Sequence, residues 1–275
     1  MSRYERFLGG RIGMAKFRAP PTPAERIIWF PFGGGNSRAF AAVAARLPAD
    51  WAAMAVDLPG HMLTDGEPLR DPTEICEALI EAFGAGFFEG AILAGHSVGG
   101  LIAAHLVRHL EPRGITSRGC VICAARPPGS NRDAGLSTFS RDELFQWWLG
   151  NLALDASADG ARDLFHLLEP SIRADVAVYE AFDTVGVHLP RTPTLVLCGI
   201  KDTIGTPSAM GGWREHIAHF TLRMIEGGHL FVLDRAAETA LAMSGALAWF
   251  KAAPQAKAER YNQGEGSNAD LLAVE

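Results

Sequence analysis

Three side chains that together could carry out acyl transfer occur along this chain in the order Ser97, Asp202, His229. A serine hydroxyl becomes an effective nucleophile only when a base takes its proton, and imidazole, with an ordinary pKa of about 6.5, suits that task near neutrality. A carboxylate that accepts a hydrogen bond from the other ring nitrogen fixes the tautomer. We therefore predict Ser97 as the nucleophile, His229 as the general base and Asp202 as the residue that orients it.

Ser97 stands in the middle of a G-x-S-x-G pattern, since residues 95–99 read GHSVG. An apolar run at 91–94 precedes the pattern and a helical pattern over 98–110 follows it, as in a nucleophile elbow between a strand and a helix. Glycines on both sides of the serine leave room for the strand and the helix to approach each other. Because the pentapeptide also arises by chance, this context carries the prediction.

Backbone N–H groups that could hold an oxyanion are expected at two places. Residues 31–36 read PFGGGN directly after the apolar run 26–30, and three successive glycines let the backbone approach a substrate closely. We predict that the N–H of Val98, together with that of Gly33 or Phe32, donates to the oxyanion, each donor contributing about 3 kcal/mol. The alternative for the glycine run is a flexible loop.

Other residues compete for the roles of base and acid. His61 follows a predicted strand at the correct edge of the sheet but precedes the elbow in the chain, so it is the less favoured base. His96 is held next to the nucleophile by sequence and cannot easily act on it. Asp183, in a helical insertion, is the alternative to Asp202. Surface or packing roles are expected for four other histidines: His105, His109, His216 and His219.

Short apolar runs alternate with helical patterns over most of the chain. Runs typical of buried strands lie at 26–30, 51–56, 91–94, 119–124, 194–199 and 220–225. Helical patterns lie between and after them at 37–47, 71–83, 98–110, 206–219 and 234–251, with Ser37 and Asp71 as expected N-caps. Such alternation predicts an α/β fold, with a mostly parallel sheet and helices on both faces. The carboxyl edge of the sheet would gather Gly33, His61 and Ser97.

A block of helical patterns interrupts this alternation and predicts a lid over the carboxyl edge of the sheet. Its helices are expected at 140–148, after an SRDE capping box, and at 158–168 and 171–182. Trp147 and Trp148 of the lid, with His61, are expected to line a substrate pocket; the alternative is that lid residues pack only on each other and the sheet. The predicted organisation is an N-terminal extension at 1–25, a core at 26–125 and 191–251, the lid at 126–190 and a disordered tail at 252–275.

Composition favours one large globular domain with an insertion. The 275 residues are 48% hydrophobic and 20% charged, and no apolar run approaches the roughly 20 residues of a membrane span. A formal net charge of −6 argues against a nucleic-acid partner. The N-terminus lacks the apolar segment of a secretory signal, so a cytoplasmic monomer is expected, without a membrane partner, metal or cofactor. The C-x-x-C at Cys120–Cys123 lies in a strand-like run and favours structural burial over metal or redox use.

With these residues placed, the chain resembles the stand-alone type II thioesterases that accompany polyketide and nonribosomal peptide synthetases, members of the α/β-hydrolase superfamily. The resemblance spans roughly residues 25–250 and rests on FPFGGG at 30–35, LPGH at 58–61, GEP at 66–68, GHSVGG at 95–100, IRAD at 172–175, Gly199 with Asp202, and GGHLF at 227–231. The family usually has His-Ala where this chain has Phe32-Gly33, Arg in place of His61 and Met-Gly-Ala at 98–100. These departures concern substrate preference, because the oxyanion donors are backbone groups.

The resemblance implies an α/β-hydrolase fold and hydrolysis of acyl groups held as thioesters on the phosphopantetheine arm of a carrier protein, which releases stalled or misprimed units. The carrier protein would be the partner, and the substrate itself would bring the phosphopantetheine. Docking would need a local basic patch, for which Arg126, Arg132 and Arg141 near the lid are candidates. Two alternatives stay open: a small-molecule carboxylesterase or lipase of the same fold, and an inactive scaffold of a biosynthetic complex.

Overall fold

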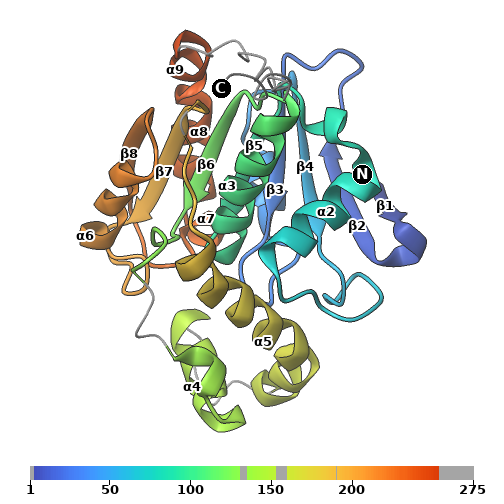
Figure 1. Ribbon diagram of the computed structural model, residues 1–275, viewed down its shortest axis with the longest axis vertical. Coiled ribbons are helices and arrows are strands. Elements are labelled where there is room, and N and C mark those ends of the chain that lie inside the picture. The colour runs from blue at the N-terminus through green and yellow to red at the C-terminus, as the bar shows by residue number, and fades with distance from the viewer. Residues whose placement is uncertain (1–2, 131–134, 153–159, 190, 254–275) are drawn as a thin grey trace, which may run out of the picture.

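The computed structural model describes residues 3–130, 135–152, 160–189 and 191–253. Its centre is an eight-stranded sheet in the order β1-β2-β4-β3-β5-β6-β7-β8 (Figure 1). The strands from β3 onward pair in parallel, whereas β1 and β2 are antiparallel. This arrangement confirms the predicted mostly parallel sheet. The strands are β1 (Arg3–Phe7), β2 (Ile12–Arg18), β3 (Glu25–Phe30), β4 (Trp51–Asp57), β5 (Ile92–His96), β6 (Gly119–Cys123), β7 (Thr194–Gly199) and β8 (Phe220–Ile225).

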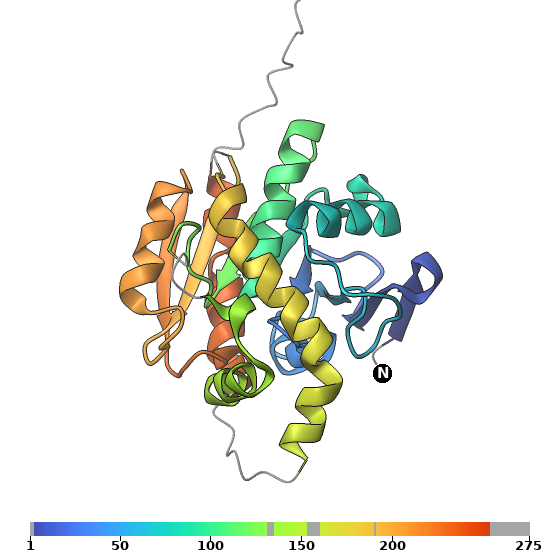
Figure 2. The same ribbon diagram turned by 60° about the horizontal axis from the view of Figure 1, so that its bottom comes forward.

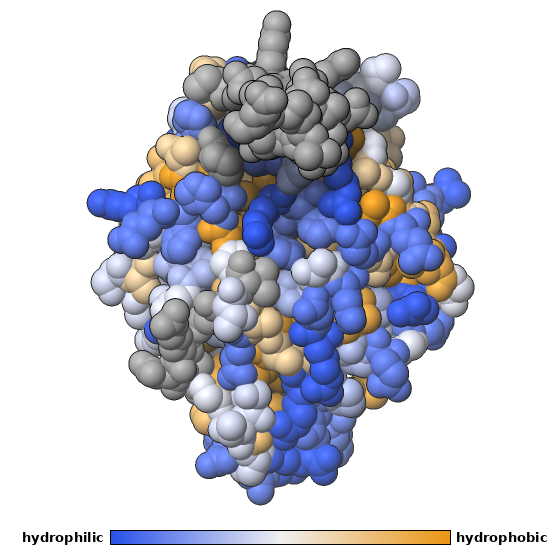
Figure 3. Space-filling view, in the orientation of Figure 1, coloured by the Kyte–Doolittle hydropathy of each residue, from blue (hydrophilic) through white to orange (hydrophobic). Residues whose placement is uncertain are grey.

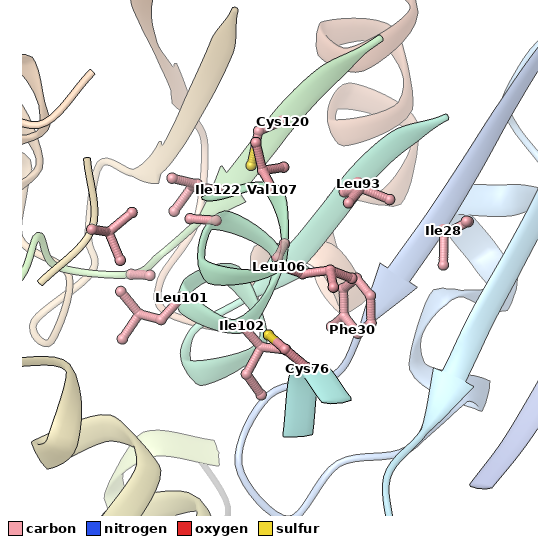
Figure 4. Close-up of a cluster of buried hydrophobic side chains, with 14 of the residues drawn as sticks. Ile28, Phe30, Cys76, Leu93, Leu101, Ile102, Leu106, Val107, Cys120 and Ile122 are labelled. Carbon is pink, nitrogen blue, oxygen red and sulfur yellow. The ribbon is translucent and has the colours of Figure 1, made fainter. Parts of the chain in front are cut away.

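Helices cover both faces of the sheet (Figure 1). On one face lie α2 (Pro72–Phe83) and α3 (Val98–Leu110), and on the other lie α1 (Ala41–Ala44), α7 (Phe231–Asp234), α8 (Ala236–Gly245) and α9 (Leu247–Ala252). Figure 4 shows apolar side chains of α3, such as Leu106 and Ile102, among side chains of the central strands, such as Phe30 and Leu93. These side chains are almost fully buried, so the packing of α3 holds the turn that precedes it in place.

Two strands occupy residues that the sequence pattern assigned to an N-terminal extension. β2 pairs antiparallel with β4, and β1 completes the edge of the sheet. Ile12 and Met14 on β2 are buried in the core, whereas the charged residues around them are partly exposed. The buried run of β2, residues 12–15, is short and lies between charged residues at 11 and 16, so only the pairing with β4 identifies the strand.

The insertion between β6 and β7 contains α4 (Arg141–Leu152) and α5 (Ala161–Val185). Figure 2 shows α5 crossing the end of the sheet at which the parallel strands finish. Two helices separated at Pro170 were predicted here, but α5 is continuous through that proline. Side chains on both sides of Pro170 are buried, with Phe165 in a cluster inside the insertion and Phe182 in the main core. Tertiary packing therefore outweighs the backbone hydrogen bond that proline removes.

Helix caps agree with the sequence pattern at two helices and differ at a third. Asp71 accepts from the N–H groups of Thr73 and Glu74, at 2.7 and 3.1 Å, which confirms it as the N-cap of α2. Before α4, the Ser140 N–H donates to Glu143 and the Glu143 N–H donates to Ser140 Oγ, which confirms the capping box. Asn36, not Ser37, caps the turn before α1; the Ser37 hydroxyl instead donates to Asp57, at 2.7 Å.

Two other predicted helices are shorter than expected. The segment predicted at 206–219 forms α6 (Pro207–Met210) and a 3₁₀ turn (Gly211–Glu215), because two glycines follow α6 directly. The segment predicted at 234–251 is divided among α7, α8 and α9. The tail predicted at 252–275 falls beyond residue 253, outside the described residues, except for its first two positions.

The described surface has a mixed character on the face shown in Figure 3, where hydrophobic patches lie between hydrophilic residues. Within the described ranges, no helix has both the length and the apolar character to cross a membrane. All four cysteines are buried and free, and burial raises the pKa of the Cys120 and Cys123 thiols well above their usual range.

Candidate active site

Ser97 occupies a strained turn between β5 and α3. Its backbone has φ 55° and ψ −126°, a conformation that side-chain-bearing residues rarely adopt. The Ser97 N–H donates to the Cys123 carbonyl of the neighbouring strand, at 2.7 Å. A Cβ on Gly95 would overlap the Gly99 carbonyl, and a Cβ on Gly99 would overlap the Phe30 carbonyl. Both glycines of the motif are thus required by close backbone contacts, as the elbow pattern predicts.

Asp202 and His229 come together from the loops after β7 and β8. The Nδ1–H of His229 donates to the Asp202 carboxylate, with distances of 3.0 Å to Oδ2 and 3.1 Å to Oδ1. The N–H groups of Ile204 and Gly205 also donate to Oδ1, at 2.8 and 2.9 Å. Burial by itself raises the pKa of Asp202, but the hydrogen bond and charge of His229 and these two N–H groups lower it below its usual range. The carboxylate is therefore ionised at neutral pH and leaves Nε2 of His229 as the proton acceptor.

Ser97 and His229 line one cavity of about 340 Å³ between the sheet and the insertion. The predicted oxyanion donors Val98, Gly33 and Phe32 line the same cavity. The structure thus brings a hydroxyl, an imidazole paired with a carboxylate, and candidate backbone donors to one edge of the sheet. In such an arrangement the imidazole can take the serine proton and the backbone can hold the resulting oxyanion.

The insertion supplies the apolar wall of this cavity. Trp147 and Trp148 of α4 line it, as predicted for the lid. Both side chains lie in or against the cluster of apolar residues inside the insertion, so lid packing and pocket lining occur together. The other apolar lining residues of the insertion are Leu136, Phe139, Ile172, Val176 and Tyr179.

The glycine-rich segment after β3 forms a defined turn. The Gly35 N–H donates to the Phe32 carbonyl, at 2.8 Å, and Gly34 has a φ of 70°, which suits glycine. The Gly34 N–H donates to Asp175 Oδ2 of α5, at 2.7 Å. That N–H group is therefore committed to a carboxylate, which leaves the neighbouring N–H groups of Phe32 and Gly33 for an oxyanion.

His61 does not line the cavity, contrary to the sequence expectation. Its ring is buried behind Asp175, with Nε2–H donating to Asp175 Oδ2 at 3.1 Å and Nδ1 lying 3.1 Å from the Pro59 carbonyl. Asp175, 114 residues away in sequence, lines the cavity instead. Sequence reasoning about site chemistry missed Asp175, and its only signal was the IRAD motif of the insertion.

His96 packs beside the pair, and within the described residues its two buried ring nitrogens have no hydrogen-bond partner. Its ring centroid lies 5.4 Å from that of His229 and 5.2 Å from that of Phe231. Burial, with a smaller contribution from the charge of His229, lowers the pKa of His96 to about 3. His96 is thus a neutral packing residue, and it adds no positive charge next to the ring that must accept a proton.

Of the three arginines predicted for docking, Arg126 and Arg141 lie in the described part of the structure. Arg126 lines the cavity and its Nε donates to the Ile204 carbonyl. Arg141 is held in an ion pair with Glu169, at 2.6 Å. Arg132 and the side chain of Asp183, the alternative acid, lie outside the described parts of the structure.

Comparisons with known proteins agree on one family. The model of the thioesterase domain family matches residues 25–245. Thioesterase PikA5 of Streptomyces venezuelae is 28% identical over 251 residues, which cover 88% of each chain. A pimeloyl-[acyl-carrier protein] methyl ester esterase of Neisseria meningitidis is 30% identical over 244 residues, covering 80% of this chain and 89% of the esterase.

The solved structure of YbtT, a type II thioesterase from the yersiniabactin NRPS/PKS biosynthetic pathway, superposes with a TM-score of 0.75. The two sequences are 26% identical, and the superposition covers 86% of this chain and 98% of YbtT. This likeness confirms the α/β-hydrolase fold implied by the sequence resemblance. Because the family model spans most of the chain, from β3 to the end of α8, we conclude that the protein belongs to the thioesterase domain family and is a hydrolase of thioesters.

Proposed function

We propose that this protein hydrolyses acyl groups held as thioesters on the phosphopantetheine arm of acyl or peptidyl carrier proteins, and so removes stalled or misprimed units in polyketide or nonribosomal peptide biosynthesis. The observation that carries the proposal is the hydrogen-bonded Asp202–His229 pair at a cavity that Ser97 also lines. The names of PikA5 and YbtT support the choice of pathway. The apolar wall of the insertion suits an acyl chain.

In the proposed reaction, Nε2 of His229 takes the hydroxyl proton as Ser97 Oγ attacks the thioester carbonyl carbon. The N–H groups of Val98 and of Gly33 or Phe32 hold the oxyanion of the tetrahedral intermediate. Collapse breaks the carbon–sulfur bond and releases the pantetheine thiol, with the proton supplied by His229. Water then gives a proton to His229 and attacks the acyl-serine ester, which releases the acid and restores the Ser97 hydroxyl.

A thioester is the bond to which this arrangement is suited. A thiol with a pKa of about 8.5 leaves as thiolate more readily than an alkoxide or an amine, so the general acid need not be strong. Every step uses side chains and backbone N–H groups of this protein, together with water. The phosphopantetheine enters as part of the substrate.

The partner in this proposal is an acidic carrier protein, which the net charge of −6 does not attract from a distance. Docking must therefore use local positive charge near the mouth of the cavity. Of the three candidate arginines near the lid, Arg126 lines the cavity. The expected cytoplasmic location and monomeric state stay predictions of the same proposal.

The experiment that tests the function is a comparison of wild-type protein with Ser97→Ala on carrier proteins that bear acetyl, malonyl and longer acyl groups. We expect wild type to release acyl groups, and the variant to lose on the order of 1,000-fold or more in turnover, because it lacks the hydroxyl that forms the acyl-enzyme. Labelling of Ser97 by a fluorophosphonate probe checks that the wild-type serine is activated. Retention of more than a few per cent of turnover in Ser97→Ala would overturn the mechanism.

A second candidate is hydrolysis of an oxygen ester on a carrier-bound acyl chain. The relative from Neisseria meningitidis, a methyl ester esterase named for an acyl-carrier protein substrate, favours it. Rates on a matched thioester and oxygen ester of the same acyl chain separate the two candidates. A higher kcat/KM on the oxygen ester would favour the esterase, and equal absence of turnover would favour an inactive scaffold.

A further inference from the structure

His61, Asp175 and Gly34 connect three segments, of which the turn after β3 and helix α5 line the cavity. His61 follows β4, Asp175 belongs to α5 and Gly34 lies in the turn after β3. One oxygen, Asp175 Oδ2, accepts from His61 Nε2–H at 3.1 Å and from the Gly34 N–H at 2.7 Å. The two ionisable side chains are 4% and 5% exposed, so solvent screens their interaction weakly.

The Asp175 carboxylate lies close to the backbone that would hold the oxyanion. A Cβ placed on Gly33 would be 3.6 Å from Asp175 Cβ and 3.9 Å from Oδ2. A negative charge at that position opposes the formation of a second negative charge in the same cavity. The carboxylate therefore needs a compensating positive charge, and the adjacent ring of His61 is placed to supply it.

We infer that His61 and Asp175 are positioning residues for the oxyanion-binding turn: Asp175 fixes the Gly34 N–H and so the backbone of Phe32 and Gly33, and protonated His61 cancels the charge of Asp175. The inference rests on the proposed function, because it concerns how that reaction's oxyanion is held. It gives the lid helix α5 a direct part in shaping the turn, in addition to covering the acyl group. It also makes the turnover depend on the protonation of a histidine that does not touch substrate.

The groups that face His61 set the pH range. Burial favours the neutral ring, but it is outweighed by the charge and hydrogen bond of Asp175 from α5, the Pro59 carbonyl and the charge of Asp57 from β4, which together raise the pKa of His61 to about 8. His61 is thus protonated at neutral pH and loses its charge above about pH 8. Turnover should therefore fall as the pH rises through this range and His61 loses its charge.

The first experiment is the pH profile of kcat on an acyl-pantetheine substrate, with the rate in Ser97→Ala subtracted as background. We expect an alkaline fall centred near pH 8 in wild type. His61→Gln, which cannot be charged, should show a kcat reduced on the order of 10- to 100-fold at pH 7, with a smaller change in KM and no alkaline fall. An alkaline fall that persists unchanged in His61→Gln would overturn the inference.

The second experiment distinguishes charge compensation from simple packing. In His61→Gln the carboxylate of Asp175 is left without a cation, whereas adding Asp175→Asn removes that charge and keeps an oxygen that can accept from the Gly34 N–H. We expect the double variant to recover at least tenfold in kcat over His61→Gln alone. A double variant no better than the single one would show that the pair acts only through packing, and would contradict the inference.

A matched control is His109→Gln, because His109 also pairs with a carboxylate, Glu77, but away from the cavity. It should leave kcat and its pH profile unchanged. Thermal unfolding and fluorophosphonate labelling of Ser97 confirm that each variant is folded and retains its nucleophile. If the probe does not label Ser97 in wild type, the proposed function itself is overturned. If Ser97 is labelled but the pH profile of kcat in His61→Gln is the same as in wild type, only the role of His61 is overturned.

Discussion

Two histidine–aspartate pairs border the same cavity, and they use opposite ring nitrogens. His229 donates to Asp202 from Nδ1, whereas His61 donates to Asp175 from Nε2 and places Nδ1 against the Pro59 carbonyl. The first ring keeps one nitrogen available to a substrate or nucleophile. The second ring has both nitrogens engaged and serves as a buried cation. The same two residue types thus support proton transfer in one place and a fixed charge in the other.

The two carboxylates also differ in what else they bind. Asp202 accepts from two backbone N–H groups of its own loop, which stabilise its charge and hold it in place. Asp175 accepts from the N–H of Gly34, which belongs to a distant segment. Asp202 is therefore a local anchor for one ring, whereas Asp175 joins the insertion to the turn after β3. Substitutions at the two aspartates should have unlike consequences.

The largest expected difference is in turnover. Asp202→Asn should reduce kcat by about 10⁴-fold, because an amide lets His229 adopt the tautomer that cannot accept the Ser97 proton. Asp175→Asn should change kcat at pH 7 by less than about tenfold, because the amide oxygen can still accept from Gly34, and should abolish the alkaline fall. Steady-state kinetics on one acyl-pantetheine substrate measures both. Equal losses in the two variants would show that the pairs do not differ as described.

A smaller difference should appear in the pH dependence of stability. The folded-state pKa of His61 is raised to about 8, so its stabilisation is fully present below about pH 6.5 and is lost as the pH rises through about 8. For Asp202 the folded-state pKa is lowered, so its stabilisation is present near neutrality and is lost in acid. Urea unfolding at pH 6 and pH 9 should show that the free energy of unfolding of wild type falls by on the order of 2 kcal/mol between the two pH values through the loss of the His61 charge. His61→Gln should not show this decrease.

If the free energy of unfolding falls by the same amount at pH 9 in wild type and in His61→Gln, the group that titrates is not His61. Urea unfolding of wild type and Asp202→Asn in the acid range tests the opposite sign. As the pH falls from neutral into the acid range, the difference in free energy of unfolding between wild type and Asp202→Asn should become smaller. A wild-type advantage that grows in acid would contradict the pairing of Asp202 with His229.

The smallest effect is expected at an exposed pair of the same type. His109 contacts Glu77 at 2.6 Å on the surface, where Glu77 is 52% exposed. His109→Gln should cost no more than about 1 kcal/mol of unfolding free energy at any pH, because solvent screens the pair. Urea unfolding of this variant gives a baseline for the buried pairs. A loss as large as that of His61→Gln would mean that burial is not what distinguishes them.

The sequence pattern predicted the parallel part of the sheet and the elbow because both arise from local features. Apolar runs marked β3 to β8, and the glycines around Ser97 marked a turn that excludes a Cβ. The two N-terminal strands were missed because β2 is identified by its partner β4 and not by its own composition. The continuity of α5 through Pro170 was missed for a similar reason, since distant packing outweighs a local helix breaker.

The sequence by itself determined the chemical groups, their order and the strained turn that presents Ser97, because a strand, a tight glycine turn and a helix are encoded within about 20 neighbouring residues. Only the tertiary structure decided which carboxylate each histidine meets. Asp202 and His229 are brought together by the parallel pairing of β7 and β8, and Asp175 reaches His61 and Gly34 across 114 and 141 residues through the placement of α5. Hydrogen bonds of that kind depend on distances of a few ångströms between segments whose separation in sequence carries no information about their separation in space.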